Sequence, residues 1–479
     1  MRRFPLLLPA ALLSGLLAFA PAAFAQDDEA ATGPTVETVE ATNADVGDAE
    51  AGDAEEDAGP KTGPKLDFVP PPAKPKSFTT VIPLLSQPEI DALQKELERN
   101  RYRDVLEAGP SNAGNREIIE TWAKWRVAQW TGYAPLPKPE KKKKDKDEKG
   151  DEEEDEPPPE PVLMVNDRLA LSDAVSDLIR EVNNGVGPRR GGRNAEAIKM
   201  QVFPILVAEL LKLKDNHLVL RTQAIKTLMR LEVAGDGGPN TPFKRFGPAI
   251  GPLFEFYQAP GETVPDLAVK YQAAQAIAFI AENGRNVPGS VELQIFKQFG
   301  ADLEAHPEWP NWMQGGLAAA ISRMGLSDGG VARSLFAVVQ DESRRDESGP
   351  FYEARVRAAA ALVRIPGVPA QVKADLPRAL EDLGRAMAKD YNEKPDAEFV
   401  ETFRLLEFCF KPIAASEAAG LPGSAILTGT EVPASLKAAH QRMHPLVKHV
   451  CNQDLTKPAS QWTPIPAADL TNAGIGGSE

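Results

Sequence analysis

The feature that most constrains this chain is a 13-residue segment that recurs four times and aligns without gaps. The copies begin 49, 44 and 41 residues apart, which is in the range of two-helix repeats. In each copy, small or apolar residues fill positions 6, 7, 10 and 13, which share one face of an α-helix. Ala and Gly at positions 5–9 let neighbouring helices approach closely. We therefore predict four helices that bury the same face, at residues 219–231, 268–280, 312–324 and 353–365.

Each copy follows a second amphipathic stretch, which is suited to form the partner helix of a pair. These stretches are residues 202–213, 249–257, 291–303 and 331–339. Turns rich in Gly, Pro and Asn separate the units. A further pair is expected at 376–389 and 396–410, and a last helix at 433–451. The sequence therefore predicts an all-α fold of about five stacked helix pairs at 163–412, followed by a C-terminal helix and tail at 413–479.

The first copy and its partner stretch resemble the HEAT repeat, including its bacterial HEAT-like variants. The matching residues are Pro204, Asp215, Val219, Arg221, Ala224 and Leu228. Later copies depart from the pattern, because Gln314 replaces the basic residue in one and none has the Asp six residues before that position. The resemblance covers about residues 198–412 and implies an armadillo-type α-solenoid. It implies no particular function.

Two columns of basic residues run through the four copies. Position 3 holds Arg221, Lys270, Gln314 and Arg355. The resemblance implies a structural role for this column, because HEAT-like repeats commonly pair the Arg at this position with the turn Asp of the same or an adjacent layer. Position 12 holds Arg230, Phe279, Arg323 and Arg364. Its arginines either have structural roles or line a groove for an acidic or phosphorylated partner, such as the chain's own acidic segment at 27–57.

The net charge of −15, from 54 basic and 69 acidic residues, is unevenly distributed. Residues 26–75 carry 13 acids and three lysines with almost no aromatic or branched side chain, so they cannot bury enough surface to fold. Segregated basic and acidic blocks mark residues 134–162 as low-complexity sequence. We predict a disordered acidic tail at 26–76 and a charged linker at 134–162. The chain lacks a concentrated basic face, which argues against nucleic-acid binding.

Residues 1–25 have the pattern of a signal peptide. Arg2 and Arg3 precede an apolar stretch from Leu6 to Ala20, and the segment 23–25 is a small-x-small cleavage site. The apolar stretch is shorter than the ~20 residues that a membrane span needs, and no later segment is long and apolar enough. We expect cleavage and export to the periplasm or the medium, with no transmembrane segment in the mature chain.

Residues 77–133 are expected to form a small helical hairpin between the tail and the linker. A capping box that starts at Ser86 opens a helix that runs to about Glu107. A second helix is expected at about 115–131. One face of this helix carries Trp122, Trp125 and Trp130. That face is either the core of the hairpin or an aromatic platform for a sugar or peptidoglycan strand.

Two groups of residues have the composition of metal ligands without the full pattern. His440 and His444 share a helix face, whereas His449 lies on the opposite face. No carboxylate completes the set, as the Glu of an H-E-x-x-H motif would. An EF-hand-like string at 145–156 has Lys149 at a ligand position. We therefore predict no metal site and no cofactor.

The two cysteines, Cys409 and Cys451, either form a disulfide or remain buried thiols. Export favours a disulfide, because such bonds persist in the periplasm and outside the cell. Antiparallel helices would hold the two cysteines far apart. A last helix that returned parallel to its predecessor would bring them together, and the intervening loop is long enough for that.

The sequence contains no recognised catalytic signature, such as a G-x-S-x-G elbow, S-x-x-K, a P-loop or G-x-G-x-x-G. We therefore expect an exported, non-catalytic scaffold whose HEAT-like surface binds another envelope or secreted protein. The candidate binding residues are Arg230, Arg323, Arg364, Trp122, Trp125 and Trp130. The alternatives are a cell-envelope carbohydrate binder that uses the Trp-rich hairpin and an enzyme of unrecognised type.

Overall fold

The computed structural model describes residues 81–131, 165–187, 194–233, 244–347, 349–410 and 434–475. These residues form sixteen α-helices, two short 3₁₀ helices and two small sheets, which confirms the predicted all-α class. The predicted signal peptide, acidic tail and charged linker lie outside the described residues. The EF-hand-like string lies outside them as well.

The first described helices are α2 (Gln87–Arg99), α3 (Tyr102–Ala108) and α4 (Ala113–Thr131). Helix α2 begins with the predicted capping box. The carboxylate of Glu89 accepts the backbone N–H of Ser86 at 2.7 Å, and the Ser86 side chain caps the first turn in return.

The prediction of a single helix that runs to about Glu107 is wrong, because this segment forms two helices, α2 and α3. Arg101, between them, has a φ of 50°, in the left-handed region where helices of L-residues end. The turn buries Tyr102 against Trp125, with the two ring centroids 6.1 Å apart. Packing of this aromatic pair therefore accompanies a break that helical periodicity does not reveal.

The other elements follow in chain order. The helices are α5 (Val165–Gly185), α6 (Asn194–Leu211), α7 (Leu218–Arg230), α8 (Ile250–Tyr257), α9 (Val264–Asn283), α10 (Gly289–Ala305), α11 (Asn311–Met324), α12 (Gly329–Gln340), α13 (Tyr352–Leu362), α14 (Ala370–Glu393), α15 (Ala397–Phe410), α17 (Ala434–Cys451), α18 (Ala467–Asn472), η1 (Gly247–Ala249) and η2 (Ala459–Gln461). The strands are β1 (Glu232–Val233), β2 (Lys244–Phe246), β3 (Gly284–Arg285), β4 (Arg345–Asp346) and β5 (Gly349–Pro350). Strand β2 pairs antiparallel with β1 and parallel with β3, and β4 pairs antiparallel with β5.

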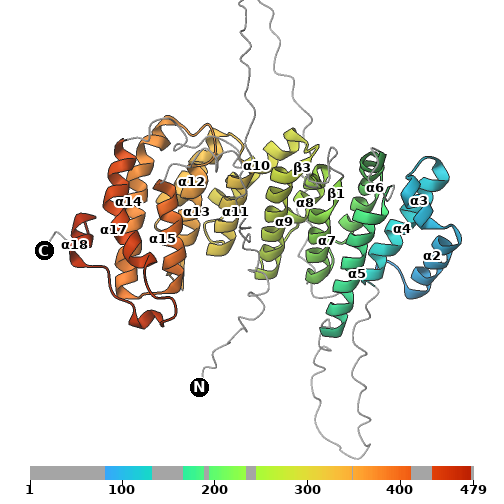
Figure 1. Cartoon of the computed structure of the whole chain (residues 1–479), viewed down its shortest axis with the longest axis horizontal. Helices are drawn as coiled ribbons and strands as arrows, with labels where there is room; N and C mark the ends of the chain where they lie inside the picture. The colour runs from blue at the N-terminus through green and yellow to red at the C-terminus, as the bar shows by residue number, and fades with distance from the viewer. Residues whose placement is uncertain are drawn as a thin grey trace, which may run out of the picture. The chain divides into compact units, whose positions relative to one another are not determined.

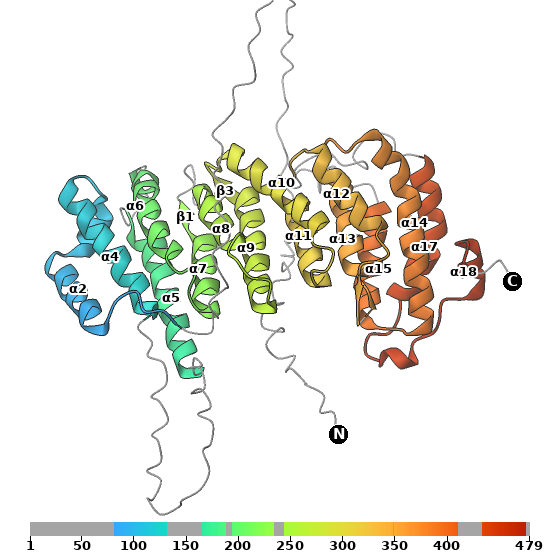
Figure 2. The same ribbon diagram turned by 180° about the vertical axis from the view of Figure 1, so that it is seen from behind.

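The repeat segments form α7, α9, α11 and α13, and their partner stretches form α6, α8, α10 and α12, as predicted. The later pair is α14 and α15, and the last predicted helix is α17. The repeat helices pack on one another in a row: α7 on α9, α9 on α11, α11 on α13 and α13 on α15. The partner helices do the same from α6 to α14. Figures 1 and 2 show the described helices side by side in chain order.

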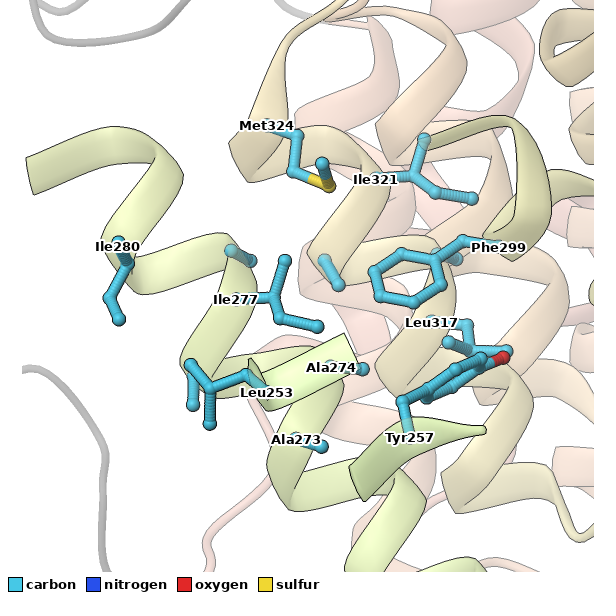
Figure 3. Packing of buried hydrophobic residues seen from close by; sticks show 14 of the residues in the cluster. Leu253, Tyr257, Ala273, Ala274, Ile277, Ile280, Phe299, Leu317, Ile321 and Met324 are labelled. Carbon is cyan, nitrogen blue, oxygen red and sulfur yellow. The ribbon is translucent and has the colours of Figure 1, made fainter. Parts of the chain in front are cut away.

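The core lies between these two rows of helices, and the predicted helix phase is confirmed. All residues at positions 6, 7, 10 and 13 of the four copies are buried, and the most exposed of them, Met324, is only 4% exposed. Figure 3 shows one layer, in which Ala274 and Ile277 of α9 share the core with Phe299 and Leu317 of the next two helices.

Small residues allow close helix approach, as the sequence suggested. A Cβ atom added to Gly316 of α11 would lie 2.2 Å from the ring of Tyr271 on α9, which is closer than any real contact. The backbone carbonyl of Gly316 also accepts a hydrogen bond of 2.8 Å from Gln275. Gly316 therefore lies where these two helices touch, and any side chain there would push them apart.

Residues 81–131 pack against the following helices, so the hairpin expected at 77–133 is not a unit separate from the repeats. Helix α4 packs against α5 and α6, and α5 packs against α7. Arg126 of α4 forms an ion pair of 2.5 Å with Glu181 of α5, and the side chain of Asn216 exchanges two hydrogen bonds with the backbone of Ile82. Helices α4 and α5 therefore form one more pair, and the linker falls inside the connection between them.

The two cysteines are free thiols, so the disulfide alternative is wrong. Helices α15 and α17 are antiparallel: His440 lies near Glu407 late in α15, whereas the Cys451 thiol lies 3.8 Å from the carbonyl of Val400 early in α15. Cys409 is buried at the other end of α15, and burial raises the pKa of its thiol to about 12. The antiparallel arrangement separates the cysteines.

Candidate functional site

An open groove with a volume of about 930 Å³ lies where α13, the turn between α14 and α15, α15 itself and the β4–β5 hairpin meet. Tyr352 and Glu353 reach it from the first turn of α13, and Glu398 reaches it from the first turn of α15. Asp396 precedes α15 and accepts the backbone N–H of Glu398 at 3.1 Å. Because α13 packs on α15, the starts of the two helices lie together.

The charged side chains of this groove are predominantly acidic. Its lining carboxylates are Glu353, Asp390, Glu393, Asp396, Glu398 and Glu401, and its lining cations are Arg345, Arg357, Lys394 and Arg404. Two of the four cations are matched within their own helices. Arg357 lies 2.8 Å from Glu353, and Arg404 lies 2.5 Å from Glu401. The remaining groups leave the groove with an excess of negative charge.

The environment of Glu398 reflects this excess. Partial burial, followed by the neighbouring carboxylates of Asp396 and Glu353, raises the pKa of Glu398, although much of its side chain is exposed. Burial also raises the pKa of Tyr352, whose hydroxyl donates a hydrogen bond of 2.7 Å to Asp390. Burial is the larger cause of both shifts, and the carboxylates of Asp396 and Glu353 add to the shift at Glu398. These neighbouring negative charges would attract a cation placed in the groove.

Apolar surface accompanies these charges. The ring of Phe399 lies beside that of Tyr352, with centroids 6.0 Å apart, and Phe408 is 38% exposed although it is a large apolar residue. Both phenylalanines line the groove with Leu405. The surface thus combines acidic groups with aromatic faces, which suits the aliphatic stem and charged end of a Lys or Arg side chain.

The basic column at position 3 is structural in all four copies. Arg221 forms a buried ion pair of 3.0 Å with Asp266, which lies in the first turn of α9 in the adjacent layer and not in the turn between two helices of a pair. Lys270, Gln314 and Arg355 instead donate hydrogen bonds to backbone carbonyls that end the preceding partner helix or lie just after it. The acceptors are Tyr257, Ala259, Pro307, Trp309 and Val339. Lys270, Gln314 and Arg355 thus tie the two helices of a pair together, whereas Arg221 joins two adjacent layers.

The three position-12 arginines do not form a common groove. Arg230 is exposed, whereas Arg323 forms an ion pair of 2.6 Å with Glu282 of the neighbouring helix. Arg364 is buried, and its guanidinium lies over the ring of Phe408. Arg364 is therefore not available to a partner, and Arg323 already has a counterion.

The three tryptophans of α4 form core rather than a binding platform. Trp122, Trp125 and Trp130 are at most 6% exposed. The guanidinium of Arg126 covers Trp125 at 4.6 Å from its ring, and the indole N–H of Trp122 donates to Glu181. A smaller cavity of about 420 Å³ lies beside Trp125 but does not expose the ring. Sugar stacking on these indoles is therefore excluded.

The structure supplies the carboxylate that the histidine pair lacked in sequence. Oε1 of Glu407 on α15 lies 3.0 Å from Nε2 of His440 and 3.0 Å from Nδ1 of His444, both on α17. His449 points elsewhere and contacts the carbonyl of Thr463 at 3.0 Å. The prediction that no carboxylate completes the set is wrong, because the third member comes from a different helix.

The acidic groove was also missed at the sequence level, although a signal for it exists. Glu353 and Glu398 occupy the first turns of α13 and α15, where the helix dipole favours carboxylates. Stacked helices that begin with acids bring those acids together at one end of the row.

No family model, no curated protein and no solved structure matches this chain.

Proposed function

We propose that this chain is an exported, non-catalytic scaffold that binds another envelope or secreted protein through the groove between α13 and α15. In this proposal the stacked pairs from α4 and α5 to α14 and α15 form a HEAT-like α-solenoid. The supporting observation for the fold is that helices of each row pack on the next of their kind. The observation that carries the function is the open, acidic and partly aromatic groove.

The partner that this groove fits is a segment rich in Lys or Arg. Burial raises the pKa of Glu398, and the carboxylates of Asp396 and Glu353 lie close enough to raise it further. A cation among them would relieve this repulsion, whereas an acidic or phosphorylated segment would increase it. Phe399 and Phe408 offer apolar contact to the aliphatic part of the same side chains. The proposed partner is therefore opposite in charge to the one that the arginine column suggested.

Site-specific photo-crosslinking in the native envelope tests the proposal. A photoreactive residue in place of Glu401 lies at the groove, and the same residue in place of exposed Ala301 on α10 is the matched control. We expect one partner to be captured from position 401 only. The double charge reversal Glu353→Lys and Glu398→Lys should abolish that capture, and added salt should weaken it.

Two results would contradict this proposed function. The first is capture of the same proteins from position 301 as from position 401. The second is capture that persists in the double charge-reversal variant when circular dichroism shows that the variant is folded. The partner's contact segment, identified by mass spectrometry, should contain Lys or Arg residues at the crosslinked site.

A further inference from the structure

A cluster of three ligand-bearing side chains joins α15 to α17, away from the groove. One carboxylate oxygen of Glu407 lies 3.0 Å from a ring nitrogen of each of His440 and His444. The candidate ligand atoms of all three residues lie within 4.8 Å of one another. The two imidazoles lie one helical turn apart with their centroids 5.1 Å apart, so both face the same carboxylate.

We propose that Glu407, His440 and His444 bind a zinc ion. Imidazole nitrogen and carboxylate oxygen are ordinary zinc ligands, at about 2.0–2.2 Å from the metal. Donor atoms already within a few ångströms of one another reach one ion by small rotations of side chains. Two neutral imidazoles and one carboxylate leave a net charge of +1 on the complex, which a partly exposed site tolerates. This inference does not depend on the proposed scaffold function.

The exposure of the three ligands defines what kind of zinc site this is. The Glu407 side chain is 10% exposed, whereas those of His440 and His444 are 30% and 49% exposed. The carboxylate is thus fixed in the interface between the helices, and the imidazoles reach the surface. Zinc prefers four ligands, so the fourth position faces solvent and takes water in the isolated chain.

Zinc binding requires a defined protonation state of both histidines. Without metal, Nε2 of His440 and Nδ1 of His444 donate hydrogen bonds to Glu407 when they carry protons. For coordination these nitrogens must present lone pairs, so each neutral ring carries its proton on the other nitrogen. The carboxylate that accepts two hydrogen bonds in one state becomes a metal ligand in the other.

The ion would fasten the last large helix to the helix stack. Helix α17 packs on α14 and α15, and its connection to α15 passes through residues outside the described part of the chain. A zinc ion held by both helices contributes its binding free energy to their association. The cluster therefore has a structural consequence that can be measured apart from any partner.

Titration of the full-length mature chain, produced without an affinity tag, with ZnCl₂ tests this inference. Excess Mg²⁺ and Ca²⁺ should be present, because hard cations occupy clusters of carboxylates but compete poorly for imidazole. We expect one zinc ion per chain by calorimetry and a higher thermal midpoint with zinc. Co²⁺ in its place should give the visible bands of a tetrahedral site with nitrogen and oxygen ligands.

Single variants assign the ligands. His440→Ala and His444→Ala change partly exposed side chains and should each weaken zinc binding by at least the 10–100-fold that loss of an outer-shell partner causes. His449→Ala, on the same helix but outside the cluster, is the matched control and should bind as the parent does. Glu407→Gln keeps the size of the side chain and should also weaken binding.

Three outcomes would overturn the zinc site. The first is that the parent chain takes up no more zinc than the double variant His440→Ala, His444→Ala. Alternatively, His449→Ala would lose as much affinity as the two cluster variants. In the third case zinc would bind but leave the thermal midpoint unchanged, which would show that the ion does not join α15 to α17.

Discussion

The position-3 column shows how one residue type acquires its partner from the stack. The Arg221 and Asp266 side chains are 1% and 4% exposed, and the pair joins two layers that lie 45 residues apart in sequence. Burial lowers the pKa of Arg221, and its ion pair with Asp266 opposes that effect. The hydroxyl of Thr263 donates a hydrogen bond of 2.6 Å to the same carboxylate. A buried pair of this kind is costly to break on one side only.

Substituting either member of this pair alone should therefore destabilise the chain strongly. We expect Arg221→Met or Asp266→Asn to lower the free energy of unfolding by about 3–5 kcal/mol, because each removes one member of a buried ion pair and leaves the other charge buried. The double variant Arg221→Met, Asp266→Asn should cost much less than the sum of the single effects. Urea denaturation of all four chains measures this double-mutant cycle. Strictly additive losses would show that the two side chains do not interact.

Glu398 provides a prediction on pH dependence. Its pKa is raised in the folded chain, so the folded state favours the neutral carboxyl more than the unfolded state does. This contribution to stability is fully present below the unfolded pKa of about 4.3 and is lost as the pH rises through the folded value. Glu398→Gln should therefore increase stability at pH 7 but not at pH 3.5. Because the side chain is largely exposed, we expect a gain below about 0.5 kcal/mol.

Chemical denaturation at the two pH values measures this difference. An equal gain at pH 7 and pH 3.5 would mean that the substitution acts through packing and not through the charge. The same variant should weaken capture of a basic partner, so stability and binding would change in opposite directions.

The environment of a residue could be predicted from the sequence where it depends on one helix alone. It could not be predicted where it depends on how two helices pack. Periodicity alone identified the buried faces, because burial of Ala224 or Leu228 follows from the phase of its own helix. Glu407 gave no signal, because its place opposite His440 depends on how α15 and α17 pack. Gln275 likewise lies outside the four buried positions of its repeat, yet its amide donates a hydrogen bond to the carbonyl of Gly316 on α11.

At the scale of elements, close contact between successive helices depends on small residues. Ala274 of α9 and Ala359 of α13 are fully buried in the helix rows. Replacing either with Leu inserts three carbon atoms into a filled layer, and we expect a loss of about 1–3 kcal/mol in unfolding free energy. Ala301→Leu on an exposed position of α10 is the matched control and should change stability by less than about 0.5 kcal/mol.

Thermal and urea unfolding of the three Leu variants measures this contrast. Comparable losses at the buried and exposed positions would contradict the packing shown in Figure 3. Ala301 is a matched control because the same two residue types are exchanged there at an exposed position.

Helix boundaries were predictable to different degrees. The capping box fixed the start of α2, because both of its hydrogen bonds are local. The break at Arg101 was missed, because the sequence there contains neither Gly nor Pro and the left-handed residue is Arg. The short sheets formed by β1 to β5 were missed as well, since each strand has two or three residues and no alternating pattern. Local chemistry thus predicted those boundaries that local contacts determine.

At the scale of the whole chain, composition misplaced a domain boundary. The charged segment 134–162 suggested a linker between two independent units. Residues 81–131 instead pack on α5 and α6. Separately, no helix in the described part of the chain is long and apolar enough to cross a bilayer. A low-complexity insertion in the connection between α4 and α5 has the same composition as a linker between domains. Only the packing of the flanking helices distinguishes the two arrangements.

Cleavage within that insertion should therefore leave one folded body. Burial of Trp122 and Trp130 alone contributes about 1.5–3 kcal/mol each to holding α4 in place. The ion pair between Arg126 and Glu181 adds a contact that is largely shielded from water, at 17% and 14% exposure. After a site-specific protease sequence replaces Lys141–Lys144 and is cut, the two fragments should elute together in size-exclusion chromatography.

The contacts between the fragments also predict how that association fails. Asn216→Ala removes both hydrogen bonds to the backbone of Ile82, and Glu181→Ala removes the partner of Arg126 and of the Trp122 indole. The uncut double variant remains tethered and should stay folded, because the second unit is held at a high effective concentration. Once cut, it should separate at concentrations where the parent fragments remain together. Separate elution of the parent fragments at micromolar concentration would show instead that residues 81–131 are an independent unit.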